Sequence, residues 1–175
     1  MESVEGAEKV ARFSFLGSRP RILLTSAGRH VEISWLRRGQ PERIKRFETR
    51  ADPLVEVQRL MRAYRYVPVA GLPRFTGGLV GYLGYNVVRF LEPRLPSHVL
   101  NDLRLPDIML MLTDTMVIFD HAQHKLLLVV NAMTQGQSAS TVYRRAVRQI
   151  HRMAEQLRRS GPSARPRPRR RTRAA

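Results

Sequence analysis

The pattern of apolar and polar residues in the first part of the chain predicts three short strands. Residues 12–17 and 21–26 are two compact apolar runs separated by a turn. Val31, Ile33 and Trp35 then alternate with other residues, which is typical of a strand with one buried face. The polar residues that follow, RRGQPE, are expected to form the next turn.

Two later segments have the spacing of amphipathic helices. In residues 51–65, Asp52 is placed to cap the first turn and Pro53 suits its first position. The apolar positions of this helix recur every three or four residues and are Leu54, Val57, Leu60, Met61 and Tyr64. Residues 140–159 predict the second helix, and its expected apolar face consists of Tyr143, Ala146, Val147, Ile150, Met153, Ala154 and Leu157.

The rest of the chain predicts further strands. Residues 76–85 form a glycine-spaced strand, residues 108–120 one long apolar strand, and residues 125–132 a strand that pairs with it across a tight turn. Together these elements predict an α+β fold, a mostly antiparallel β-sheet packed with two main helices. A strand that is apolar on both faces suits a sheet covered on both sides, and two helices cover only one.

Short motifs for phosphate or metal binding are incomplete. Gly78, Gly81 and Gly84 lie three residues apart, without the spacing or the lysine of a phosphate-binding loop, so we interpret them as points of close backbone approach. His121 and His124 lie in an expected turn and lack further zinc ligands of a matching pattern. The sequence therefore predicts no metal site and no cofactor in this chain.

Composition and charge divide the chain into two parts. The 175 residues include 43% hydrophobic residues, which suffice for a core, and carry a net charge of +17. Residues 158–175 hold eight arginines and no acid, so we expect a domain over residues 1–157 and a basic, Arg/Pro-rich disordered tail over residues 158–175. The lack of cysteine, of a signal peptide and of a membrane-spanning run fits a cytoplasmic protein.

The positive charge also suggests an anionic partner such as nucleic acid. The last expected helix carries four arginines on its polar face, Arg144, Arg145, Arg148 and Arg152. Polar faces of surface helices are commonly solvated. The sequence therefore favours a solvated face here over a nucleic-acid contact.

Three long motifs carry a resemblance to a known family. ESVEGAEKVARFSFLG resembles ESVEGGEKWGRYSFLG of anthranilate synthase component I, and DPLVEVQRLMRAYRYVPVAGLPRFTGGLVGYLGYNVVRFLE resembles its helix, Pro-rich connector and GGxVGYxGYD segment. LPDIMLMLTDTMVIFDHAQHKLLLVVNA resembles the family's LPDxxxMxxDTxVVFDHxxxxxxLVAN strands. The match runs from Glu2 to about Leu157. Aminodeoxychorismate synthase component I resembles the chain more loosely and is the alternative.

The resemblance implies an incomplete N-terminal domain. The chain begins within the family's LLES motif, and the chorismate-binding catalytic domain is expected to be absent from it. The full-length family converts chorismate to anthranilate and pyruvate in tryptophan biosynthesis, using magnesium and ammonia from a glutamine amidotransferase subunit. We therefore expect a regulatory or structural fragment that carries no catalytic residue and is inactive alone.

The resemblance also implies part of a feedback site for tryptophan. Glu2 and Ser3 match the last two residues of LLES, and Arg12 matches a basic residue of the following strand. A bound zwitterion needs acceptors for its ammonium group and donors for its carboxylate, which these residue types supply. Asn86 departs from the aspartate of the family's GYD. A second hypothesis remains, a repurposed binding module whose Arg-rich tail contacts nucleic acid.

Overall fold

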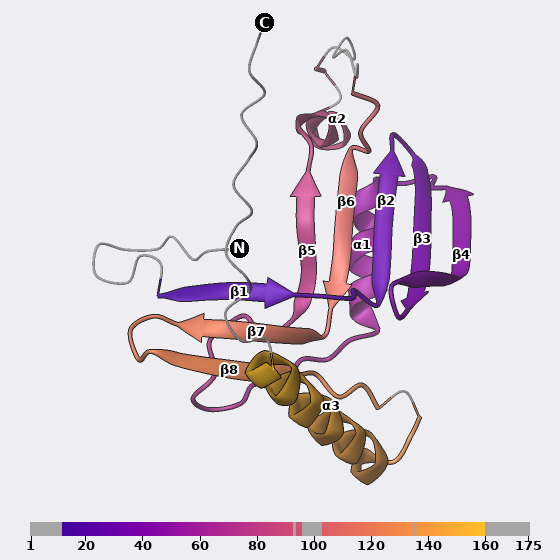
Figure 1. Cartoon of the computed structure of the whole chain (residues 1–175). Coiled ribbons are helices and arrows are strands. Elements are labelled where there is room, and N and C mark those ends of the chain that lie inside the picture. The colour runs from indigo at the N-terminus through magenta and orange to yellow at the C-terminus, as the bar shows by residue number, and fades with distance from the viewer. Residues whose placement is uncertain (1–11, 93, 96–102, 135, 160–175) are drawn as a thin grey trace, which may run out of the picture.

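The computed structural model describes residues 12–92, 94–95, 103–134 and 136–159, and within these residues it has the predicted α+β fold (Figure 1). The strands are β1 Phe13–Gly17, β2 Ile22–Ala27, β3 His30–Arg37, β4 Gln40–Glu48, β5 Gly78–Leu83, β6 Ile108–Thr113, β7 Thr115–Asp120 and β8 Lys125–Val130. The helices are α1 Pro53–Arg62, α2 Val88–Leu91 and α3 Ala139–Arg159, with a single 3-10 turn, η1 Tyr85–Val87, before α2.

The strands form two antiparallel sheets rather than one. The larger sheet has the order β4-β3-β2-β6-β5, and the smaller has the order β1-β7-β8. The smaller sheet runs across one end of the larger one (Figure 1). The prediction of one continuous strand over residues 108–120 is therefore wrong: β6 belongs to the larger sheet and β7 to the smaller, and the chain changes sheets at Asp114.

Strand β4 begins within the predicted turn at residues 37–42 and continues over residues for which the sequence predicts no strand. Its residues are mostly charged and exposed, so they lack the alternation that marks a half-buried strand. Charge is tolerated because β4 is an edge of the sheet, where it discourages pairing with other chains. Two of its cations pack on aromatic rings, with the Arg43 guanidinium 4.8 Å from the Trp35 ring centre and the Lys45 ammonium 4.7 Å from that of Phe47.

Helix α1 covers one face of the larger sheet. Asp52 caps the helix as predicted, accepting a hydrogen bond from the backbone N–H of Leu54 at 2.8 Å. The buried Glu56 carboxylate accepts hydrogen bonds from Thr49 at 2.9 Å and Arg59 at 2.7 Å, which ties the helix to the end of β4. The core between helix and sheet is formed by Ile22, Leu24, Val31, Ile33, Val87, Ile108 and Leu112, against which Leu54, Val57, Leu60, Met61 and Tyr64 pack.

Helix α3 packs against β8 of the smaller sheet with only its first half. Val142 and Ala146 are buried, and Gln149 donates a hydrogen bond to the Thr115 hydroxyl at 2.9 Å. The expected place of Tyr143 in the apolar face is wrong, because its side chain is 67% exposed. Tyr143 lies near the start of the helix.

The change of sheet at Asp114 is held by three contacts. Arg21 donates to the Asp114 carboxylate at 3.3 Å, and the backbone N–H of Asn131 donates to the Asp114 carbonyl at 2.7 Å. The Asn131 side-chain amide donates to the carbonyl of Thr76 at 2.7 Å, so the end of β8 also binds the segment that enters β5. The strand is interrupted here, and these hydrogen bonds take the place of those that a continuous strand would make with its neighbouring strands.

The interpretation of the glycines as points of close backbone approach is confirmed at Gly81 and is wrong at Gly78, where a Cβ would meet only the Phe75 side chain at 3.6 Å. A Cβ built at Gly81 would overlap the carbonyl oxygen of Met109 on the neighbouring strand β6. The larger sheet therefore needs glycine here to keep β5 paired with β6.

We predict that Gly81→Ala lowers the free energy of unfolding by about 2–3 kcal/mol, because the backbone must shift to admit the methyl group. Leu83→Ala on the same strand removes a side chain that is 53% exposed and should cost less than about 0.5 kcal/mol. Urea unfolding of the two variants measures both values. Equal losses would contradict the close approach.

Candidate functional site

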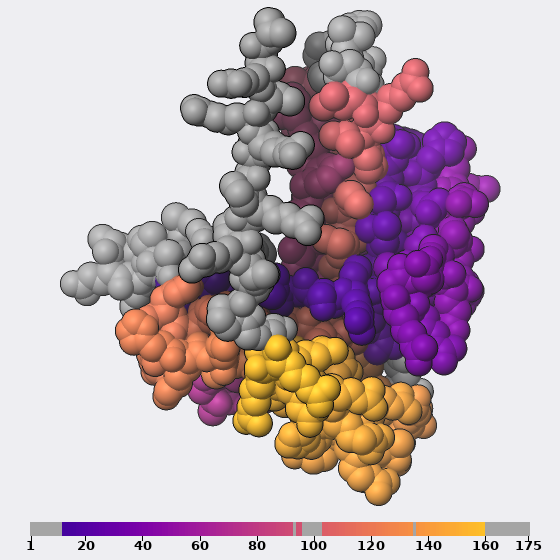
Figure 2. All heavy atoms as spheres, in the orientation of Figure 1, coloured from indigo at the N-terminus to yellow at the C-terminus, as the bar shows by residue number. Residues whose placement is uncertain are grey.

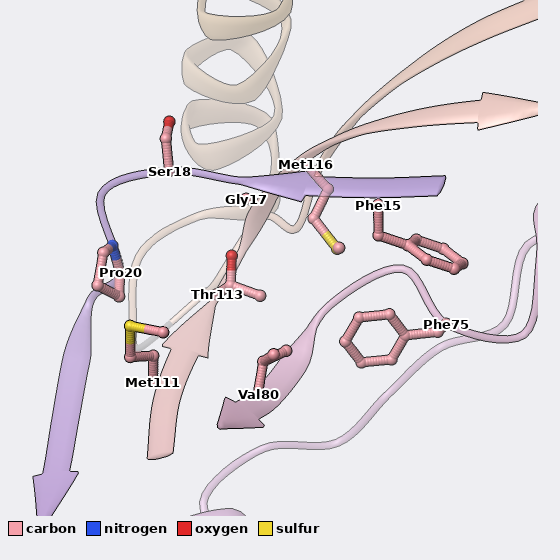
Figure 3. A pocket seen from close by; sticks show the side chains of 9 residues that line it. All are labelled: Phe15, Gly17, Ser18, Pro20, Phe75, Val80, Met111, Thr113 and Met116. Atoms are coloured by element: carbon pink, nitrogen blue, oxygen red, sulfur yellow. The ribbon is translucent and has the colours of Figure 1, made fainter. Parts of the chain in front are cut away.

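A small pocket lies where the two sheets meet (Figure 3). Its volume is about 150 Å³. The side chains that line it come from both sheets and their connections, and are Phe15, Gly17, Ser18, Pro20, Phe75, Val80, Met111, Thr113 and Met116. The ring centres of Phe15 and Phe75 lie 5.6 Å apart in an edge-to-face arrangement that forms one wall.

The pocket is apolar and contains no titratable side chain. Thr113 contributes a hydroxyl, which donates to the Thr115 carbonyl at 3.4 Å. Gly17 leaves the space beside this hydroxyl open, since a Cβ there would lie 2.9 Å from Thr113 Oγ1. Such a pocket can hold a small apolar group, and it offers no general acid or base for catalysis.

Arg12 lies outside this pocket, just before β1. Its guanidinium makes two hydrogen bonds to Asp120 at the end of β7, from Nε at 3.1 Å and from Nη2 at 2.9 Å. The guanidinium also lies 4.8 Å from the centre of the Phe13 ring. The two-point contact with Asp120 fixes the plane of the Arg12 side chain.

Asp120 also binds the turn between β7 and β8. Its Oδ1 accepts hydrogen bonds from the backbone N–H groups of Ala122 and Gln123, both at 3.1 Å. The hydrogen bond from Arg12 lowers the pKa of the Asp120 carboxyl, and the two backbone donors lower it further. The hydrogen bond to Asp120 raises the pKa of the Arg12 guanidinium above its usual value.

The other predicted site residues are distributed as follows. Glu2 and Ser3 lie outside the described residues. His121 bonds through Nε2 to the Ser14 hydroxyl at 2.8 Å and stacks on Phe119, and His124 adopts a left-handed turn conformation. Within the described part of the chain, no three His, Cys, Asp or Glu side chains form a group that could hold a metal.

Sequence reasoning did not find the pocket. Phe75 falls in the connector before β5, and Met111 and Met116 belong to what the sequence presents as one strand. The pocket depends on the change of sheet at Asp114, which places Met111 and Met116 on different sheets. No spacing in the sequence signals that change. No helix among the described residues is long and apolar enough to cross a membrane.

Comparison with solved structures defines the fold. The chain matches a crystal structure of anthranilate synthase component I from Streptococcus pneumoniae TIGR4 with a TM-score of 0.57 and 21% sequence identity, covering 90% of this chain and 33% of that one. The described elements thus have the α+β fold of a domain in that protein. No family model matches the sequence.

Comparison with curated proteins gives the particular relatives. The chain is 38% identical over 159 residues to anthranilate synthase component 1 of Pseudomonas aeruginosa, covering 90% of this chain and 31% of the relative. It is 37% identical over 172 residues to the protein of the same name from Pseudomonas putida, and 31% identical over 158 residues to the probable anthranilate synthase component 1 of Schizosaccharomyces pombe. The chain is therefore homologous to a segment of anthranilate synthase component I, and it spans about a third of the length of these relatives.

We predict that the Arg12–Asp120 pair makes stability depend on acid pH. A carboxyl whose folded-state pKa is lowered stabilises the fold fully above its unfolded pKa of about 3.9. This contribution disappears as the pH falls through the lower folded-state pKa. Asp120→Asn should therefore lower the melting temperature near neutral pH, with a difference from the unmodified chain that shrinks below about pH 4.

The matched control is Glu42→Gln, which removes the acid of the exposed Arg37–Glu42 pair, with side-chain exposures of 73% and 60%. This variant should melt like the unmodified chain across the pH range, because exposed ion pairs contribute little. Melting curves between about pH 2 and 7 measure both differences. A constant difference for Asp120→Asn down to the lowest pH would contradict the assignment.

Proposed function

We propose that this chain is a regulatory and structural unit of an anthranilate synthase component I system in the cytoplasm, inactive by itself. The observation that carries the proposal is the similarity of 90% of the chain to about a third of the Pseudomonas aeruginosa relative. In this proposal a chorismate-binding catalytic domain makes anthranilate from chorismate with magnesium. Ammonia comes from a glutamine amidotransferase subunit.

The side of the larger sheet opposite helix α1 supports a protein partner. Helix α1 covers one face, and the opposite face carries Leu23, Thr25, Val80, Tyr82, Met109 and Met111, here called the open face. Met111 is 37% exposed and Tyr82 is 38% exposed. The open face adjoins the mouth of the pocket through Val80 and Met111.

The open face is mostly apolar, so contact with a protein would stabilise it more than exposure to water. The residues of the open face on β2, β6 and β5 are mostly apolar. On the same side of the sheet, β3 and β4 carry the Arg46–Glu32 ion pair at 2.6 Å. An apolar centre with a polar margin is typical of a protein interface. We assign this face to the catalytic domain, because the relatives contain about twice as much further chain as this protein matches.

We predict that the purified chain alone produces no anthranilate from chorismate, ammonia and magnesium. Adding the remaining two thirds of the Pseudomonas aeruginosa relative, expressed separately, should restore fluorescent product. Met111→Glu should weaken this restoration at least tenfold by placing a charge in the interface. Leu126→Glu changes a side chain on β8 that is 50% exposed, outside the open face, and serves as the control.

Anthranilate formed by the chain alone would contradict the proposal that it is inactive. Restoration that is equally strong with Met111→Glu and with the unmodified chain would contradict the assignment of the open face and leave the rest of the proposal standing. Both outcomes are read in the same fluorescence assay.

We propose further that Glu2, Ser3 and Arg12 contribute one wall of a tryptophan feedback site, with Asp120 holding the Arg12 guanidinium in position. Tryptophan should bind the chain alone weakly, because a single wall supplies few contacts. Affinity should rise at least tenfold when the separate catalytic domain is added, and Ser3→Ala should remove this gain. Calorimetry measures these affinities, and micromolar binding by the isolated chain would contradict the prediction.

A further inference from the structure

Helix α3 lies at the surface of the molecule (Figure 2), and its arginines recur along its length. Six arginines lie among its 21 residues, and Glu155 is its only acid. All six are exposed. Within the described residues, Arg159 is the one arginine of this helix with an ion pair, a loose 3.6 Å contact with Glu155.

Three of these arginines form a straight row. Arg144, Arg148 and Arg152 follow one another at intervals of four residues, so they lie one above the other on the same side of the helix. Each step along the row rises about 6 Å. Phosphates of one nucleic-acid strand rise about 3.4 Å per nucleotide, so the row matches every second phosphate.

The type and place of the side chains favour nucleic acid over a lipid surface. Arginine binds phosphate through a planar pair of N–H donors, and the helix contains six arginines and no lysine. A helix that lies on a membrane inserts its apolar side. Here the first half of that side is occupied, because Val142 and Ala146 are buried at 6% and 8% exposure and the helix packs against β8.

An exposed aromatic ring lies near the start of the helix, about 100° around the helix axis from Arg144. This ring belongs to Tyr143, whose side chain is 67% exposed although its spacing predicts a buried position. An exposed tyrosine on a helix with phosphate-binding arginines offers a surface on which an unpaired base can stack. The sequence after α3 adds six more arginines in residues 160–175.

We propose that α3 is a nucleic-acid-binding surface, in which Arg144, Arg148 and Arg152 contact alternate phosphates of a strand and Tyr143 stacks on an unpaired base. This site is separate from the open face and from the pocket, and it differs from the interpretation of these arginines as a purely solvated face. The helix buries Val142 and Ala146 of its apolar side and leaves Tyr143 exposed.

The test measures binding of the full chain to fluorescent single-stranded RNA of mixed sequence and to a DNA duplex of equal length, between about 50 and 200 mM salt. Replacing Arg144, Arg148 and Arg152 together with glutamine should weaken binding more than about tenfold and reduce the slope of log affinity against log salt by about two. The triple lysine variant should keep that slope, because charge is retained. Tyr143→Ala should weaken RNA binding about fivefold or more and duplex binding less.

The matched control removes three exposed arginines elsewhere, Arg62, Arg65 and Arg74, each changed to glutamine. It has the same change in net charge and should weaken binding less than about threefold. A second control deletes residues 160–175, which should reduce the salt slope but leave the effect of the α3 variant in place. Circular dichroism verifies that each variant is folded.

Three outcomes would overturn the proposal. Equal losses in the α3 variant and the control variant would mean that net charge alone drives binding. Loss of all binding on deletion of residues 160–175, with no effect of the α3 substitutions, would assign the interaction to those residues. Binding to vesicles of anionic lipid, with none to RNA or DNA, would assign the helix to a membrane surface.

Discussion

The change of sheet at Asp114 is the constraint on which the rest of the structure depends. One apolar segment supplies the centre of both sheets, because β6 lies between β2 and β5 and β7 lies between β1 and β8. The Asp114 carbonyl accepts from Asn131 at 2.7 Å, its carboxylate accepts from Arg21 at 3.3 Å, and Gln149 of α3 binds the adjacent Thr115 at 2.9 Å. The junction at Asp114 and Thr115 is therefore contacted by the turn before β2, the end of β8 and helix α3. The pocket and the position of α3 both follow from where the smaller sheet is held.

The sequence predicts the parts of the fold that bury a regular apolar pattern. Helix α1 begins at Pro53 with Asp52 as its cap, and β7 and β8 pair across the turn that contains His121, all as predicted. Two features are not predictable by the same means. Strand β4 has charged residues because it lies at an edge, so its pattern does not differ from that of a loop. The break at Asp114 leaves the apolar pattern unchanged, because residues on both sides of it are buried, and the division depends on hydrogen bonds with residues distant in sequence. The Arg12–Asp120 pair could not be predicted from the sequence for the same reason, because its two residues lie 108 positions apart.

The surface of the chain has three regions with different physical character. The open face is apolar and adjoins an apolar pocket, α3 is strongly cationic, and the β3–β4 half of the larger sheet combines charges of both signs. Homology over 90% of the chain connects it with a segment of anthranilate synthase component I. The cationic surface of α3 is chemically different from the open face, because its arginines have few acidic neighbours within the described residues.

We expect the two sheets to unfold as one cooperative unit joined at Asp114. Native-state hydrogen exchange of the chain measures this, because it reports the free energy of opening for each strand. The slowest amides of β2, β6 and β7 should exchange with the same opening free energy and respond equally to low concentrations of denaturant. Exchange of β7 and β8 at the rate of an unfolded peptide, while β2 and β6 remain protected, would show that the two sheets are not one unit and would contradict the account.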